Sequence, residues 1–477
     1  MAFSLRRKDV RGRVLIPKFY DPDLREAEKL ASKHYELKRL GDLLLPGPEG
    51  SRLGSWIRRE HYGSGDIPYV RTSDLVNWRI RPDYKKAVSE EVYESVRATQ
   101  DVRVNDILFV AHGTYLVGNV AIVTEAETKL VLQDHVFRLR IDPTSGLSPL
   151  VLLAALSTAF VRRQVRARQF SADIIDKIGE RHLDIVVPIP AEKAQCAAVA
   201  RVVANVIKEQ NAARQEVSDI AAVQSRMTKE RAESNLGFQV SRRSLRSRIL
   251  VPKYYDPRIS EALARVQVDS GETWLQLSHY IEQGVLSADT GAEVGKMAYG
   301  TGSVPFIRTS DIVDLELRRD TRHCVSEEIY ESYKDKAGVL PGDVLIVRDG
   351  TYLVGSSAQV SPEDGVALVC GGIYRLRVSD DSKLLPQTLL LALNLPLVRQ
   401  QLRARQFTRD VIDTLGKRLL EVKVPPLTSK HWRELGERLG GAMQRKARAK
   451  TAIGQSIELV EPPAPKVISG RPSWSMR

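Results

Sequence analysis

The chain contains the same sequence pattern twice. The segment DIPYVRTSDL at 66–75 returns as SVPFIRTSDI at 303–312, and VSEEVYES at 88–95 returns as VSEEIYES at 325–332. The offset is 237 residues in both cases, and two copies of that length fill almost all of the 477 residues. Each copy of an internal repeat normally forms one structural unit, so this duplication constrains the fold more than any other feature. We therefore expect two similar modules in tandem.

Three further pairs of segments extend the repeat over the chain. Two pairs keep the offset of 237, whereas the pair nearest the N-terminus has an offset of 235, which indicates an insertion of two residues. The pairs are RVLIPKFYDP (13–22) with RILVPKYYDP (248–257), DILFVAHGTYLVG (106–118) with DVLIVRDGTYLVG (343–355), and VRRQVRARQFSADIIDKI (161–178) with VRQQLRARQFTRDVIDTL (398–415).

Each copy has the pattern of strands with interspersed helices, followed by one long helix. The segments around Gly-Thr-Tyr alternate and are rich in β-branched and aromatic residues, which predicts two strands joined by a tight loop. The next segments begin as apolar helices and end in Arg-rich turns. Pro188 and Pro190 in one copy, and Pro425 and Pro426 in the other, end a strand and mark the start of the long helix.

Both long helices carry a seam of inward positions at alternating spacings of three and four residues, which is typical of coiled coils. The seam runs through Cys196, Val199, Val203, Val206, Gln210, Ala213, Val217, Ile220, Gln224 and Met227 in the first helix, and through Trp432, Leu435, Leu439, Ala442, Lys446, Ala449 and Ile453 in the second. The first stretch is roughly 45–55 Å long at 1.5 Å per residue, which exceeds a small globular face. We expect an antiparallel coiled coil with pseudo-twofold symmetry. The alternative is two independent amphipathic helices, each lying on its own module.

The predicted fold class is therefore mixed α/β (α+β), with two repeated modules that are each followed by a long helix. The expected boundaries are 1–190 for the first module, 191–236 for the central long helix, 237–427 for the second module, 428–460 for the distal helix and 461–477 for a flexible tail.

The composition favours a folded chain with a polyanionic partner. Hydrophobic residues make up 43% and charged residues 27%, which excludes collagen, low-complexity disorder and a multi-span membrane protein. The formal net charge is +13, and an excess of this size favours nucleic acid as the partner. The most apolar runs, 149–161 and 384–398, are shorter than the ~20 residues that a membrane span needs, so no membrane partner is expected.

The cysteines and the N-terminus favour a reducing, cytoplasmic location. Cys196, Cys324 and Cys370 have neither the spacing of a disulfide framework nor that of a zinc site, so we expect buried thiols and no metal. The first residues, MAFSLRRKDVRGR, carry charge without an apolar stretch behind it, so no signal peptide is expected.

The motifs P-[YF]-[VI]-R-T-S-D-[LI] and G-T-Y-L-V-G, in two modules that each precede a long helix, resemble the specificity (S) subunit of type I restriction-modification systems. The most specific blocks are Arg71 to Asp74 and Arg308 to Asp311. The resemblance implies that each module is a target recognition domain for one half of a split site in double-stranded DNA, with the helices as a ruler. It also implies docking of two DNA adenine methyltransferase (modification) subunits, a restriction or translocase subunit in the complex, and a role in phage defence.

Specificity is expected where the two copies differ. They differ most at 77–87 against 314–324, at 35–65 against 270–302, and at Ala111-His112 against Arg348-Asp349. Arg348 can donate to guanine O6 and N7 together, whereas His112 offers one donor or acceptor, so the two modules are expected to read different bases. The basic excess supplies phosphate contacts, which position the protein without specifying a sequence.

The candidates for DNA contact lie in the RTSD segments, the Gly-Thr-Tyr loops and the Arg-rich turns. They are Arg71, Thr72, His112, Thr114, Tyr115, Arg162, Arg163, Arg166, Arg168, Arg308, Thr309, Arg348, Thr351, Tyr352, Arg399, Arg403 and Arg405. The Arg-rich turns are the stronger phosphate candidates because a solvated face normally mixes signs and these runs carry no acid. Alternatively, Arg71 and Arg308 only tie a loop to a carboxylate, and the tyrosines are half-buried core.

No catalytic residues and no cofactor are expected. The sequence has no GxxxxGK[ST] phosphate loop, no methyltransferase tetrad, no GxSxG and no HExxH. The triplets at 36–38 and 127–129 have the Glu-x-Lys form of a metal nuclease, but neither recurs in the other copy, where Val366 replaces Lys129. Besides a DNA-reading subunit, an assembly scaffold that binds protein remains a possible class.

Overall fold

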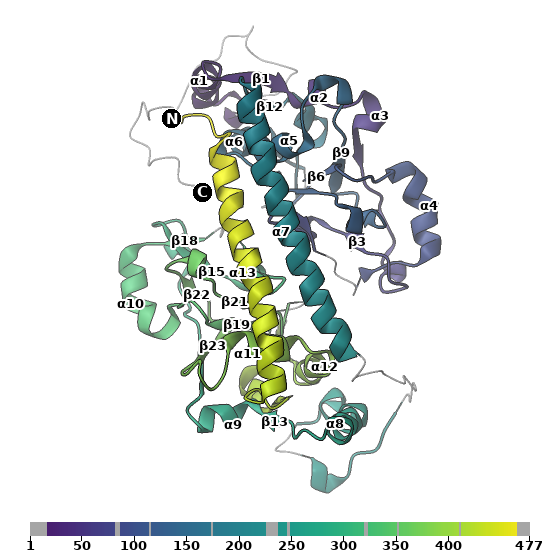
Figure 1. Ribbon diagram of the computed structural model, residues 1–477, viewed down its shortest axis with the longest axis vertical. Helices are drawn as coiled ribbons and strands as arrows, with labels where there is room; N and C mark the ends of the chain where they lie inside the picture. Colours follow the sequence, from purple (N-terminus) through teal and green to yellow (C-terminus); the bar gives the residue numbers. More distant parts are fainter. Residues whose placement is uncertain are drawn as a thin grey trace. The chain divides into compact units, whose positions relative to one another are not determined.

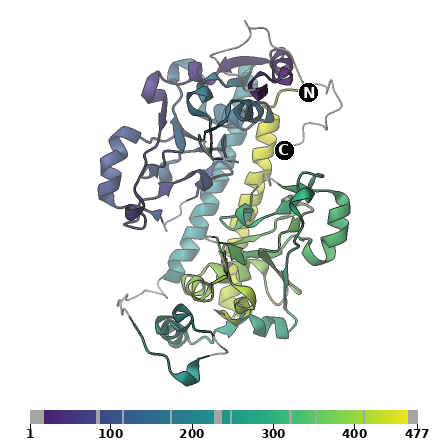
Figure 2. The ribbon, with the colours of Figure 1, turned by 180° about the vertical axis from the view of Figure 1, so that it is seen from behind.

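The structure is a computed structural model, and its chain divides into two compact units. It describes residues 17–81, 86–113, 116–172, 175–225, 237–245, 249–318, 323–350, 353–409 and 412–464. Unit 1 is formed by the chain up to Val206 together with residues from Lys450 onward, and unit 2 is formed by Ile207–Ala449. Both units mix helices and strands (Figures 1 and 2), which confirms the fold class predicted from the sequence.

Unit 1 is built on a four-stranded antiparallel sheet with the strand order β2-β9-β6-β7. Its strands are β2 (Ser51–Leu53), β6 (Ile107–Val110), β7 (Val120–Ile122) and β9 (Val136–Leu139). The smaller pairs are β1 (Tyr35–Arg39) with β12 (Val186–Pro190), β3 (Tyr69–Val70) with β8 (Val131–Leu132), β4 (Leu75–Val76) with β5 (Arg79–Ile80), and β10 (Phe170–Ala172) with β11 (Ile175–Lys177). The helices are α1 (Pro22–Ala31), α2 (Leu40–Leu43), α3 (Gly47–Gly50), α4 (Glu90–Gln100), α5 (Pro149–Leu156) and α6 (Ala159–Arg168).

Unit 2 contains the corresponding sheet, with the strand order β14-β23-β19-β21. These strands are β14 (Leu286–Thr290), β19 (Val344–Val347), β21 (Ser357–Gln359) and β23 (Ile373–Val378). The others are β13 (Leu275–Gln276), β15 (Val304–Ile307), β16 (Ile312–Val313), β17 (Glu316–Leu317), β18 (Cys324–Val325), β20 (Asp349–Gly350), β22 (Leu368–Val369), β24 (Phe407–Arg409), β25 (Ile412–Thr414) and β26 (Lys423–Val424). The helices are α8 (Pro257–Ser270), α9 (Leu277–Glu282), α10 (Glu327–Ala337), α11 (Pro386–Asn394) and α12 (Pro396–Ala404).

The two sheets share one register. Ile107 lies opposite Leu139 in unit 1, and Val344 lies opposite Leu376 in unit 2, so both partners are displaced by the repeat length. The central strand β19 reads VLIV and is buried along its whole length. Its alternate residues face two different apolar clusters, one shared with α11 and one with β15 and β22, which explains a continuous apolar run without polar alternation.

The VSEE segments start a helix in both units. The hydroxyl of Ser89 accepts a hydrogen bond from the Val92 N–H at the start of α4, and Ser326 does the same for Ile329 at the start of α10. The two Glu residues that follow each serine lie in the first turn, where the helix dipole favours negative charge. Figures 1 and 2 show α4 and α10 at the periphery of their own units.

The two longest helices are α7 (Lys193–Ser225) and α13 (Lys430–Glu458), which lie inside the ranges predicted from the seams. The part of α7 from residue 207 onward and the part of α13 up to residue 449 belong to unit 2. There, Ala213 and Ile220 of α7 share an apolar cluster with residues of α13. Glu216 pairs with Arg438 and Glu209 pairs with Arg445, so the helices run in opposite directions there. Among the described residues, no helix combines the length and the apolar character that a membrane span requires.

The segment expected to form a tail begins with an anchored residue. The carboxylate of Glu461 accepts hydrogen bonds from the backbone N–H groups of Ala159 (2.6 Å) and Phe160 (3.0 Å), and its backbone carbonyl accepts one from the Tyr35 hydroxyl. Residue 461 is thereby fixed to the first turn of α6. Residues 465–477 lie outside the described part of the chain.

Candidate nucleic-acid interface

The RTSD segment of unit 1 forms a short turn closed by its own aspartate. Thr72, which is half-buried, starts a 3-10 turn that ends at Asp74. The buried carboxylate of Asp74 accepts hydrogen bonds from the backbone N–H of Arg71 (2.9 Å) and from its Nε (3.2 Å). The guanidinium of Arg71 is therefore held by this turn, which is the loop-tying role that the sequence left as the alternative to DNA contact.

The same turn in unit 2 directs its arginine differently. Asp311 again accepts the backbone N–H of Arg308 at 2.9 Å. The exposed guanidinium, however, hydrogen-bonds to His323 Nε2 at 2.9 Å and lies 5.8 Å from the ring centre of Tyr299. One backbone motif thus places two equivalent arginines in different surroundings.

In unit 1, His112 lies where the end of β6 meets the β10–β11 hairpin. Its backbone pairs with Lys177, and Gly113 N–H donates to the Asp176 carbonyl at 3.0 Å. The imidazole ring lies 4.8 Å, centre to centre, from that of His135. Burial, together with the nearby His135 and Lys177, lowers the pKa of His112, which favours the neutral ring with one donor and one acceptor nitrogen.

In unit 2, the equivalent place is occupied by an ion pair. Arg348 donates from Nε (2.9 Å) and Nη2 (2.6 Å) to the same oxygen, Oδ2, of Asp349. The guanidinium lies 5.8 Å from the ring centre of Tyr374. The backbone of Asp349 pairs with Thr414, which stands where unit 1 has Lys177.

Thr309 lies close to the backbone beside this ion pair in unit 2. A Cβ on Gly372 would lie 3.2 Å from Thr309 Cγ2 and 3.7 Å from the Asp349 carbonyl oxygen, so these three residues meet at one point. Gly372 is the counterpart of His135. The RTSD turn of unit 2 and the segment that follows its central strand therefore approach each other at Gly372. The candidates Thr114, Tyr115, Thr351 and Tyr352 lie outside the described residues.

Several arginines of the Arg-rich turns are engaged by distant parts of the chain. Arg163 pairs with Asp21 (2.8 Å) and Asp23 (3.0 Å) near the start of α1. Arg399 donates to the Gly355 carbonyl behind the Gly-Thr-Tyr loop, and burial lowers its pKa to about 10. Both arginines thus have intramolecular partners that lie far away in the sequence, and the absence of acids within the runs did not reveal these partners.

Arg168 and Arg405 also have structural roles, and the roles are the same in both units. Arg168 donates to the carbonyl of Asp184 at 3.1 Å, and Arg405 donates to the carbonyl of Glu421 at 3.5 Å. Both also donate to a carbonyl one helical turn earlier in their own helix. Arg162 is half-buried and attracts the carboxylate of Glu461, whose pKa burial raises.

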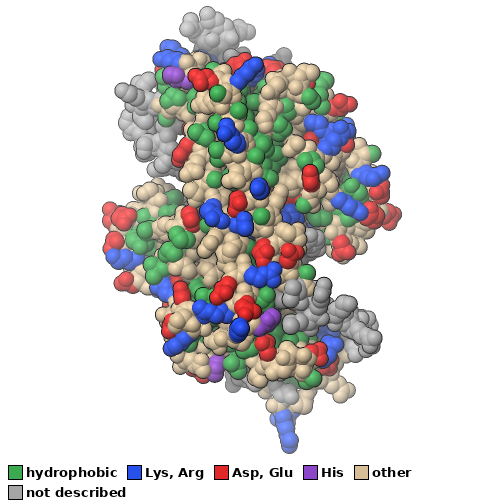
Figure 3. All heavy atoms as spheres, in the orientation of Figure 1, with side chains coloured by type: hydrophobic (Ala, Val, Ile, Leu, Met, Phe, Trp, Pro, Cys, Tyr) green, Lys and Arg blue, Asp and Glu red, His purple; other side chains and the backbone are tan. Residues whose placement is uncertain are grey.

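Two arginines of these runs remain available. Arg166 and Arg403 are equivalent in the repeat and exposed, and neither side chain forms an ion pair or a hydrogen bond with any described residue. On the face shown in Figure 3, basic side chains lie among acidic ones, so overall charge does not select a binding face there. Unpaired arginines at matching positions are the more specific phosphate candidates.

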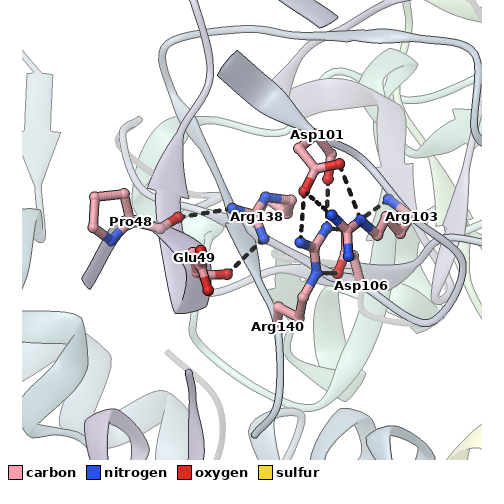
Figure 4. Close-up of polar contacts among 7 residues, drawn as sticks. All are labelled: Pro48, Glu49, Asp101, Arg103, Asp106, Arg138 and Arg140. Carbon is pink, nitrogen blue, oxygen red and sulfur yellow. Dashed lines mark hydrogen bonds and ion pairs between the residues drawn. The ribbon is translucent and has the colours of Figure 1, made fainter. Parts of the chain in front are cut away.

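The sequence interpretation missed a buried arginine network that supports the sheet of unit 1. Arg138 donates from Nη1 and Nη2 to the carbonyls of Glu49 and Pro48 at 2.9 and 2.8 Å. Arg140 donates to the carboxylates of Asp101 and Asp106, each at 2.8 Å (Figure 4). The available signal was the spacing of two residues between Arg138 on β9 and Arg140 just after it, together with the acids Asp101 and Asp106 before β6. No group of His, Cys, Asp and Glu side chains within the described ranges is arranged to hold a metal ion.

A second missed feature is an aromatic and arginine stack beneath each hairpin. Arg181 lies 4.2 Å from the ring centre of Phe170 and donates to the Arg168 carbonyl at 2.8 Å. In unit 2, Arg418 lies 4.0 Å from Phe407 and donates to the Arg405 carbonyl at 2.9 Å. The signal in the sequence was that the phenylalanine and the arginine have the same separation in both copies.

Comparisons with known proteins give structural matches only. No family model and no curated protein matches the chain. The S subunit of a type I restriction-modification system from M. genitalium aligns with 91% of this chain and 96% of its own, at 13% identity and a TM-score of 0.36. The HsdS subunit from Thermoanaerobacter tengcongensis aligns with 90% of this chain and 95% of its own, at 17% identity and a TM-score of 0.28.

A third structure, described as the basis of complex assembly and conformational transition of the type I R-M system, aligns with 89% of this chain and 94% of its own. The identity is 18% and the TM-score is 0.28. Two of the three are described as belonging to type I restriction-modification systems, and the remaining one is described as an HsdS subunit.

Proposed function

We propose that this chain is the non-catalytic specificity subunit of a type I-like restriction-modification complex and reads a bipartite, asymmetric site in double-stranded DNA. The observation that carries the proposal is one sheet register, present twice, with different polar side chains at the same point. Unit 1 has His112 and Lys177 where unit 2 has Asp349 and Thr414. Equivalent frames with different readers suit two different half-sites at a fixed spacing.

The reading chemistry follows from the two clusters. A neutral His112 offers one donor or one acceptor to a base edge. In unit 2, the hydrogen bonds to Asp349 hold the planar guanidinium of Arg348 in one orientation. When a guanine replaces Asp349 as its partner, Arg348 is suited to bidentate recognition of that base. Arg166 and Arg403 would hold phosphates and set the register without specifying sequence.

The helices α7 and α13 are proposed as the ruler between the half-sites and as the docking surface for two DNA adenine methyltransferase subunits, with a restriction or translocase subunit completing a cytoplasmic defence complex. Within unit 2 the two helices run in opposite directions and are joined by ion pairs, which suits a paired-helix rod of fixed length. The domain boundaries after residues 190, 236, 427 and 460, which were predicted from the sequence, are part of the same proposal.

Methylome sequencing of cells that carry the full system tests the proposal. The expected target has two different half-sites separated by a gap of fixed length and unspecified sequence. A palindromic, uninterrupted target would contradict it. The purified chain alone should transfer no methyl group from S-adenosylmethionine. DNA binding that lacks any salt dependence would favour a protein-binding scaffold instead.

A further inference from the structure

Unit 1 displays a tryptophan at its surface. The side chain of Trp56 is 68% exposed, whereas Trp78, Trp274 and Trp432 are all at least 95% buried. Trp56 is thus the exposed tryptophan of the described part of the chain. Tryptophan is highly buried on average, so an exposed one is a candidate for a binding role.

The backbone holds Trp56 outward by anchoring both of its neighbours. Ser55 N–H donates to the Leu132 carbonyl at 2.8 Å, and the Ser55 hydroxyl accepts from Gln100 Nε2 at 3.0 Å. Ile57 lies in an apolar cluster with Ile67 and other core residues. Successive side chains of an extended chain point to opposite sides, so inward anchors at 55 and 57 direct residue 56 away from the core.

Trp56 lies beside the proposed reading site of unit 1. Ser55 forms a parallel bridge with Gln133, which brings the next residues of the two segments, Trp56 and Asp134, side by side. His135 follows directly, and its ring packs against His112. The loop after Trp56 continues with Arg58 and Arg59, which are both exposed, and Arg58 lies 3.7 Å from the carboxylate of Glu60. An aromatic ring and basic side chains next to the reading residues match the bases and phosphates of one DNA segment.

Comparison of the two repeats distinguishes a role of Trp56 in DNA binding from a role in protein docking. The counterpart of Trp56 in unit 2 is Glu293, which lies near Arg348 and raises its pKa. A carboxylate cannot stack on a base and repels phosphate. If both modules dock the same kind of methyltransferase, the docking surface must be shared between them. This position is Trp in one module and Glu in the other, so it serves the function in which the modules differ. That function is the recognition of their respective half-sites.

We infer that Trp56 is an apolar wedge that stacks against the bases at one step of the half-site bound by unit 1, and that unit 2 has no wedge at this position. The inference rests on the proposed function. Insertion at a base step unstacks and bends the duplex, and flexible pyrimidine–purine steps deform most readily. Trp56 would thereby add a preference for a deformable step to the hydrogen-bond reading by His112.

The test uses the full complex and duplexes that carry its methylome-defined target, with 2-aminopurine placed at successive positions through both half-sites. A rise in 2-aminopurine emission at one step of one half-site is expected with the wild-type chain. Trp56→Ala should abolish this rise and weaken DNA binding roughly 5- to 150-fold, the range for loss of one base–aromatic stack. Trp56→Phe should retain most of the affinity, because phenylalanine also stacks.

Val104→Ala, at another exposed apolar residue of unit 1, is the matched control and should bind DNA as the wild type does. An unchanged emission rise with Trp56→Ala overturns the inference. Normal DNA binding by Trp56→Ala combined with loss of the methyltransferase subunits also overturns it, in favour of protein docking. A wild-type complex with no bipartite target would instead remove the proposed function itself.

Discussion

Lys446 of α13 binds the turn between β16 and β17 through Asp314. Its Nζ donates to the Asp314 carbonyl oxygen at 2.6 Å and to Oδ2 at 2.8 Å. The Lys446 side chain is 2% exposed although it occupies a seam position of the helix. Asp314 begins the variable segment 314–324 and has a left-handed backbone, with φ of 51°. In unit 2 the long helix is therefore fastened directly to a segment in which the two repeats differ.

Replacing Lys446 by Met should lower the free energy of unfolding by about 2–3 kcal/mol, because two acceptors lose a charged donor while Asp314 keeps partial access to water. Urea denaturation measures the change. Arg445→Met is the control, since Arg445 pairs with Glu209 at the surface and its loss should cost less than about 1 kcal/mol. Equal stability of Lys446→Met and the wild type would show that the contact contributes nothing.

Arg166→Ala and Arg403→Ala should each weaken binding to all DNA sequences alike. Each change should reduce the slope of log K against log salt by about one unit, as expected for one lost phosphate contact. Binding isotherms at several salt concentrations measure this slope. Arg163→Ala serves as the control, because Arg163 is paired with Asp21 and Asp23 and should affect stability while leaving the slope unchanged. The opposite pattern would reject the assignment.

Arg348→Ala should relax recognition in one half-site only, by about 1–3 kcal/mol for a lost bidentate base contact. His112→Ala should act on the other half-site. Methylome sequencing of each variant in the full system reads both effects at once. If a single substitution relaxes both half-sites equally, the two modules do not read DNA separately.

His182 makes the stability of unit 1 depend on pH. It stacks on Phe137 at 4.1 Å between ring centres and bonds to Ser51 Oγ at 2.8 Å. Burial lowers its pKa, against opposing effects of the Gly179 carbonyl, Glu180 and Asp184. Below about pH 6.5 the unfolded chain binds a proton at this histidine that the folded chain does not, so stability should rise with pH in the window below 6.5.

His182→Leu should reduce that rise by up to about 1.4 kcal/mol per pH unit, which is the contribution of one proton. Leucine is the matched replacement because Leu419 occupies the equivalent, fully buried position in unit 2. Denaturation at pH values from 5 to 8 measures the effect. A slope that is unchanged in the variant would place the pH dependence elsewhere, for example at His112.

The sequence identified the positions of many candidate site residues, but it did not identify the partners of their side chains. The repeat located both RTSD turns and both strand ends, whereas the approach of Thr309 and Asp349 to Gly372 emerged only from the structure. The difference between Arg71, which is held by Asp74, and Arg308, which reaches His323, was not predictable. Identical local sequences direct the backbone identically, whereas the side chain follows neighbours that lie many residues away.

The sequence by itself determined the duplication, the mixed α/β class and the approximate ranges of the two long helices, because these depend on repeated motifs and on apolar periodicity. Only the tertiary structure decided which arginines form ion pairs or hydrogen bonds with distant residues. Arg163 meets Asp21 across 142 residues, whereas Arg166, one helical turn further, meets no described acid. The pairing of a charge depends on which distant segment is packed against it, and that packing is set by burial of the whole module.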